Sequence, residues 1–148
     1  MSTIWILVAN QAQAKIYSTS RIPGNLALIG TLKHPEGAAH AGDLGAYAPG
    51  KAFNRTGPAR HGIEPETSVK EEGRRRFVKE IVGRLQTAHL RGEFQRLVLL
   101  AAPAVLGVIR KTLNGELVRT VIREIPKDVV GQGSDKVHTQ LVRSFTLK

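Results

Sequence analysis

The chain contains no cysteine among its 148 residues. This absence excludes a disulfide framework, a thiolate metal site and a cysteine nucleophile, and it is typical of proteins that work in a reducing compartment. The apolar run near the N-terminus, Ile4 to Ala9, lacks a basic leader and is far shorter than a membrane span. We therefore interpret this run as a strand, and we expect a cytoplasmic protein without membrane insertion.

Acidic residues are scarce. The chain has 12 Asp and Glu residues against 22 Lys and Arg residues, which gives a formal net charge of +10. A surplus of this size favours a polyanionic partner such as RNA, DNA or an acidic membrane surface. Charge that serves only solubility is the alternative. The length suits one domain over residues 1–148, and a domain of this size buries roughly two-thirds of its unfolded surface.

Regular periodicity is missing from His34 to Glu66, between two well-patterned halves. Segments of this length inside a compact domain are uncommon, and they are usually binding loops or disordered stretches. We therefore expect a long flexible loop at 34–66 that takes part in binding. Its turn-forming residues are Pro35, Pro49, Pro58 and Pro65 with Gly37, Gly42, Gly45, Gly50, Gly57 and Gly62.

The first third of the chain has strand patterns. Ile4 to Ala9 is apolar without alternation, which is typical of a central strand covered on both faces. Gln13 to Ser18 alternates between apolar and polar residues, and Leu26 to Lys33 follows the turn signal Pro23 to Asn25. These patterns predict a three-strand antiparallel meander.

Helical spacing begins after the loop. Ser68 and Glu71 have the spacing of a capping box, which predicts that a helix starts at Ser68. The helix would bury one apolar stripe. The residues of this stripe are Phe77, Val78, Ile81, Val82, Leu85 and Ala88.

The remaining chain alternates strands and helices. Phe94 to Ala102 reads as a buried strand, Pro103 opens a short helix that Asn114 and Gly115 close, and Val121 to Ile125 is a further strand. Ser134 would cap a final helix. Helical crossovers between the later strands imply parallel pairing. We therefore predict an α/β fold with a ribonuclease-H-like mixed sheet of about five strands.

Several segments together resemble the bacterial host-attachment protein family, whose members are described as required for attachment to host cells. The resemblance spans nearly the whole chain, and it rests on the order and spacing of the pieces. It implies a factor that affects attachment to host cells, and we expect that role to be indirect. The matching segments are Trp5 to Ala9, Ala14 to Tyr17, Pro49 to Phe53, Arg76-Phe77, Leu97 to Pro103, Leu106-Gly107 and Glu124 to Asp128.

That family in turn looks like the middle domain of eukaryotic and archaeal peptide-chain release factors. The shared features are a strand-rich start, a long loop and a basic helix that begins near an Arg-Phe pair. Release factors carry a Gly-Gly-Gln tripeptide in the loop, whereas this chain has none, and Gly131-Gln132-Gly133 has the wrong order. The resemblance therefore implies a shared fold without peptidyl-tRNA hydrolysis, because fold does not transfer function.

The loop and the basic helix supply candidate RNA-binding residues. Lysines and arginines would contact phosphates, and exposed aromatic rings would stack on bases. We expect Arg74 and Arg75 to point outward together; the alternative is a solvated face with weak pairs such as Glu71 with Arg75 and Glu80 with Arg84. The candidates are Lys51, Arg55, Arg60, Arg74, Arg75 and Lys79 as cations, with Tyr47 and Phe53 as stacking residues.

No complete catalytic constellation is present. Gly45 to Lys51 matches half of a P-loop, but Ala52 replaces the hydroxyl residue that would bind magnesium. The first strand has no acid for a two-metal nuclease site, and the five histidines match no standard zinc spacing. We therefore expect neither a cofactor nor a metal site.

Three functional hypotheses remain open at this point. The first is a non-catalytic cytoplasmic protein that binds the ribosome or structured RNA through the basic loop and helix. The second is a factor indirectly required for bacterial attachment to host cells. The third is an unrecognised hydrolase or nuclease. The oligomeric state does not follow from the sequence.

Overall fold

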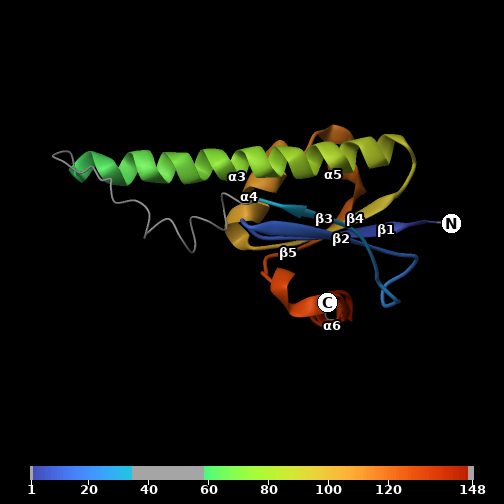
Figure 1. Cartoon of the computed structure of the whole chain (residues 1–148). Coiled ribbons are helices and arrows are strands. Elements are labelled where there is room, and N and C mark those ends of the chain that lie inside the picture. Colours follow the sequence, from blue (N-terminus) through green and yellow to red (C-terminus); the bar gives the residue numbers. More distant parts are fainter. Residues whose placement is uncertain (1, 35–58, 147–148) are drawn as a thin grey trace.

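The computed structural model describes residues 2–34 and 59–146, and it places the side chains of 2–34 and 69–145. Its centre is one five-stranded mixed sheet with the order β3-β2-β1-β4-β5 (Figure 1). The three N-terminal strands pair antiparallel, whereas β4 pairs parallel to β1 and β5 parallel to β4. The strands are β1 (Ile4–Ala9), β2 (Gln13–Thr19), β3 (Ala27–Lys33), β4 (Arg96–Ala101) and β5 (Val121–Ile125).

β1 is the central strand. All six of its residues are buried, because β2 and β4 pair with its two edges and helices cover both faces. Its side chains alternate between the two faces, as in any extended strand. Trp5, Leu7 and Ala9 enter one apolar core, while Ile4, Ile6 and Val8 enter the other.

Helices cover the two faces of the sheet unequally (Figure 1). The side of Trp5 and Leu7 is covered by α3, α4 and α5, and the opposite side by α6 and a short 3-10 turn. The crossover from β3 to β4 runs through α3, and the crossover from β4 to β5 through α4 and α5. These elements are α3 (Ala59–Leu90), α4 (Pro103–Thr112), α5 (Gly115–Thr120), η2 (Val130–Gln132) and α6 (Gly133–Thr146).

The larger core lies between the sheet and α3. Phe77, Ile81 and Leu85 of α3 are at most 2% exposed and follow one stripe of the helix. The smaller core lies under α6, where Val137 and Leu141 pack against β1 and β4. Burial in this smaller core raises the pKa of the Tyr17 hydroxyl above its usual value.

The predicted α/β fold is confirmed. The five strands, the antiparallel start, the parallel extension and the flanking helices form the ribonuclease-H-like arrangement that the sequence predicts. The buried stripe of α3 is also confirmed, since Phe77, Val78, Ile81, Val82, Leu85 and Ala88 all belong to the larger core.

The predicted start of the long helix is wrong. α3 begins at Ala59 rather than Ser68, so residues 59–66 are helical and the remaining part of the predicted loop, 35–58, lies outside the described residues. Nucleation is the costly step in helix formation, and each further residue adds one hydrogen bond. A helix anchored by its buried stripe therefore extends past the capping box, and it also includes Pro65, which has no N–H to donate to the carbonyl four residues earlier.

The sequence prediction also missed α5. Asn114 does not close α4, which ends at Thr112; its side chain instead accepts a hydrogen bond from the Leu117 backbone N–H at 3.2 Å. This contact is a helix N-cap, and it starts the six-residue α5. A segment this short carries too few periodic positions to be recognised in the sequence.

Asn10 organises the carboxyl end of β1. Its side-chain oxygen accepts hydrogen bonds from the backbone N–H groups of Ala12 at 2.8 Å and Gln13 at 2.9 Å, which closes the turn into β2. Its side-chain nitrogen donates to the carboxylate of Asp128 at 3.2 and 3.3 Å. One side chain therefore connects the first turn to the segment that follows β5.

Replacing Asn10 with alanine removes these hydrogen bonds and leaves two backbone N–H groups of the turn without their acceptor. We expect Asn10→Ala to lower the free energy of unfolding by about 1–2 kcal/mol in urea denaturation. Gln11→Ala is the matched control, because that exposed side chain forms none of the hydrogen bonds seen in the described residues. Equal stability of the two variants would show that the Asn10 contacts are not stabilising.

Candidate functional site

Helix α3 is longer than the sheet that it covers. Its 32 residues span about 48 Å at 1.5 Å per residue, whereas a six-residue strand spans about 20 Å. The N-terminal half of α3 extends beyond the sheet (Figure 1). Val69 to Glu72 are exposed on this extension, and Gly73 is the first buried residue whose surroundings are described. The described part of this extension therefore presents its side chains to solvent.

Arg75 and Lys79 lie together on the outer side of α3. Both are exposed, and their spacing of four residues places their side chains on neighbouring turns of the same face. The buried stripe around Ile81 lies on the other side of the helix. Arg75 and Lys79 are therefore the predicted RNA-binding cations whose described side chains point together toward solvent.

Arg74 does not share this outer face, contrary to the expectation from the sequence. It precedes Phe77 and Val78 by three and four residues, so it continues the buried stripe toward the N-terminus. Its side chain is partly buried, and its Nε atom has no hydrogen-bond partner among the described residues. Spacing along α3 separates Arg74 from Arg75, although the two are adjacent in the chain.

The other predicted site residues are not placed. Tyr47, Lys51, Phe53 and Arg55 lie outside the described residues, as does the half P-loop from Gly45 to Lys51. The backbone of Arg60 is part of α3, but its side chain lies outside the described part of the structure.

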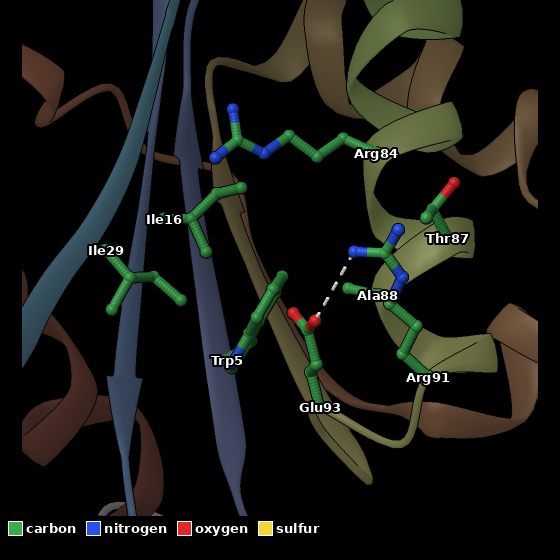
Figure 2. Close-up of a pocket in the computed structure, with 8 residues that line it drawn as sticks. All are labelled: Trp5, Ile16, Ile29, Arg84, Thr87, Ala88, Arg91 and Glu93. Carbon is green, nitrogen blue, oxygen red and sulfur yellow. Dashed lines mark ion pairs between the residues drawn. The ribbon is translucent and has the colours of Figure 1, made fainter.

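Two of the predicted helix pairs, Glu71 with Arg75 and Glu80 with Arg84, are not among the ion pairs of the described residues. The ion pairs seen there join Arg91 with Glu93 at 4.0 Å and Arg110 with Glu124 at 2.6 Å. Glu80 and Arg84 are four residues apart on α3 but are not an ion pair. Arg84 instead turns toward the sheet (Figure 2).

A pocket of about 500 Å³ lies between the sheet and the C-terminal half of α3 (Figure 2). Trp5, Ile16 and Ile29 form its apolar side on β1, β2 and β3. Its polar side comes from one face of α3, at positions i, i+3, i+4 and i+7. These residues are Arg84, Thr87 and Ala88 of α3 and Arg91 directly after its end, and Glu93 completes the rim.

Sequence reasoning missed this pocket. The helical spacing of Arg84 and Arg91 is visible in the sequence, but Ala88 between them belongs equally to the core stripe. The partner strand also carries an irregularity that no pattern predicts. Ile16 pairs with Gly30 and Tyr17 with Leu28, so Ile29 is an extra residue in β3 at a β-bulge.

Gly30 allows Arg84 to approach the sheet. A Cβ atom built on Gly30 would lie 2.7 Å from Nη2 and 3.2 Å from Cζ of Arg84, so the guanidinium occupies the space that a side chain would fill. The β-bulge beside Gly30 changes the direction of the Ile29 side chain, which lines the same pocket. Two local features of β3, the glycine and the bulge, therefore shape one side of the pocket.

Gly30→Ala should displace the Arg84 guanidinium without unfolding the protein. Gly30 has no positive φ, and the clashing atoms are the far end of a flexible side chain. We expect the free energy of unfolding to change by less than about 1 kcal/mol, because alanine also restricts the unfolded chain. Urea denaturation measures the stability, and ¹⁵N spectra of the arginine side chains report the displacement. A loss of several kcal/mol would mean that the contact is rigid.

Among the described residues, the remaining polar groups do not cluster as a metal site requires. No group of three or more His, Asp or Glu side chains is close enough there to hold a metal ion. Glu124 pairs with Arg110, and Asp128 contacts Asn10. None of the described helices combines the length and the apolar character that crossing a membrane requires.

Comparison with known proteins places the chain in a described family. The model of the family described as "Protein required for attachment to host cells" matches residues 5–141. An uncharacterised protein of Rickettsia prowazekii is 30% identical over 77 residues, which are 51% of this chain and 51% of the relative. The chain thus matches about half of the length of that curated relative.

Two solved structures are similar to the fold. An archaeal translation termination factor has a TM-score of 0.47 and 13% identity, over 97% of this chain and 38% of that chain. A further archaeal protein has a TM-score of 0.45 and 14% identity, over 96% of this chain and 36% of that chain. In both cases this chain corresponds to well under half of the larger structure.

Proposed function

The chain belongs to the family of proteins required for attachment to host cells, and from this premise we propose that it contributes to bacterial attachment as a binding protein. The observation that carries the proposal is the extent of the family match, which runs from Trp5 in β1 through the other four strands to Leu141 of α6. The proposed mode of action is binding, and the basic face of α3 and the pocket supply surfaces that would support it.

The proposed role in attachment is indirect and cytoplasmic. A chain of 148 residues without cysteine is typical of a reducing compartment. A protein there would affect attachment through intracellular partners that control the adhesive surface. The large surplus of positive charge suits acidic partners of that kind.

Deletion of the coding sequence should lower the number of bacteria attached to cultured host cells. Re-expression of the intact chain should restore attachment, and growth in medium without host cells should stay unchanged. Cell fractionation should recover the protein with the cytoplasm, and a protease added to intact bacteria should leave it uncut. Attachment equal to the parent strain would contradict the role, while a protease-sensitive protein would contradict the indirect mode.

A second candidate function is binding of the ribosome or structured RNA. The specific observation in its favour is the exposed pair Arg75 and Lys79 on the outer side of α3, in a chain with a net charge of +10. Docking would be electrostatic, and counterion release would supply much of the affinity. Binding would therefore weaken steeply with salt.

The double variant Arg75→Ala with Lys79→Ala tests this second candidate. If both side chains contact phosphates, ribosome co-sedimentation at graded salt should give a log–log slope flatter by about 1.4 to 1.8 units. The matched control is Lys136→Ala with Arg143→Ala, which removes two exposed charges from α6 on the opposite side of the sheet. If the two double variants changed ribosome binding equally, the binding would depend only on the net charge of the protein. That result would contradict a specific site on α3.

A further inference from the structure

The pocket between β3 and α3 combines an apolar side with uncompensated positive charge. Trp5, Ile16 and Ile29 line the side on the sheet. Arg84 has no carboxylate partner among the described residues, and Arg91 is 4.0 Å from Glu93. The described rim therefore carries two guanidinium groups and one carboxylate, and its net charge is one positive charge.

The size and chemistry of the pocket suit a small ligand. Its volume of about 500 Å³ falls within the roughly 300–1,000 Å³ that is usual for small-molecule sites. Such sites are mostly apolar, with a few polar groups that fix the orientation of the ligand. Here the guanidinium of Arg84 is that group, because its planar donors match a carboxylate in a bidentate manner.

The geometry of β3 favours a small ligand over an added peptide strand. β3 is an edge strand, and Leu28 and Ile29 on it are 53% and 43% exposed. Bulges on edge strands disturb further strand pairing, and the bulge at Ile29 is of this kind. The same bulge directs Ile29 into the pocket, where it adds apolar surface (Figure 2).

We propose that this pocket binds a small amphiphilic carboxylate, with its apolar body against the exposed side chain of Ile29 and over the buried floor that Trp5 and Ile16 form, and with its carboxylate on the guanidinium of Arg84. The body would be a medium-length acyl chain or a single aromatic ring. Arg91 offsets Glu93, whose carboxylate would otherwise repel the ligand. The proposal is independent of the role in attachment and of RNA binding, since it uses neither Arg75 nor Lys79.

The chain carries its own reporter for this site. Trp5 is the only tryptophan in the sequence, and it lines the pocket. A ligand that packs against its ring changes its fluorescence. Titrations with decanoate and with 3-phenylpropanoate show whether the pocket prefers an acyl chain or an aromatic ring as the apolar body of the ligand. The uncharged 3-phenylpropanamide tests whether binding requires a carboxylate.

At least one of the two carboxylates should produce a saturable change in Trp5 fluorescence and bind more tightly than the amide. Arg84→Ala should weaken carboxylate binding about tenfold, as expected for a hydrogen bond to a charged group, and leave amide binding unchanged. Arg75→Ala is the matched control, because it removes the same charge from the outer side of the same helix. It should leave both affinities unchanged.

Gly30→Ala is the second variant, and it keeps the net charge while a Cβ atom displaces the Arg84 guanidinium. It should weaken carboxylate binding in the same direction as Arg84→Ala. It also keeps the proposal falsifiable if Arg84→Ala does not fold. The absence of saturable binding by both carboxylates, or equal binding of carboxylate and amide, would overturn the proposal.

A peptide ligand gives a different result. An extended acidic peptide that added to β3 would protect the outward amides of that strand from hydrogen exchange. Such protection, without binding of either small carboxylate, would replace the proposed ligand by an added strand. Equal losses in Arg75→Ala and Arg84→Ala would show attraction by net charge, and they would also contradict the proposal.

Discussion

The structure depends on the complete burial of β1. A strand of six apolar residues is stable only if its two edges are hydrogen-bonded and both of its faces are covered. The antiparallel hairpin to β2 satisfies one edge, and the parallel strand β4 satisfies the other. Parallel pairing requires a crossover, and α3 supplies it while covering the face of Trp5 and Leu7. The opposite face then needs a second cover, which α6 provides.

The sequence predicted the parts of the fold that depend on this burial. The uninterrupted apolar run of β1 and the stripe of α3 from Phe77 to Ala88 each report a packing requirement, so pattern and structure agree. The start of α3 could not be predicted in this way, because propagation from a packed segment continues past a local start signal such as the capping box at Ser68. α5 was missed for a related reason, since six residues contain too little periodicity.

The candidate sites were less predictable than the fold. Adjacent arginines look equivalent in a sequence, yet a helix rotates each residue by about 100°, so Arg74 faces the protein body while Arg75 faces solvent. The pocket depends on a glycine and a bulge in β3, and their effect is seen only when Arg84 is placed against them. Side-chain direction on α3, rather than the number of basic residues, therefore decides which charges can meet a ligand.

The two candidate surfaces of α3 are separated by the geometry of the helix. Arg75 and Arg84 are nine residues apart, which is two and a half turns, so their side chains leave the helix on opposite sides. A helix with its side chains is about 10–12 Å across, and charges in solution at physiological salt are screened within about 8 Å. A polyanion on the outer side and a carboxylate in the pocket would therefore interact only weakly. The two activities can be gained or lost independently, although one helix carries both sets of residues.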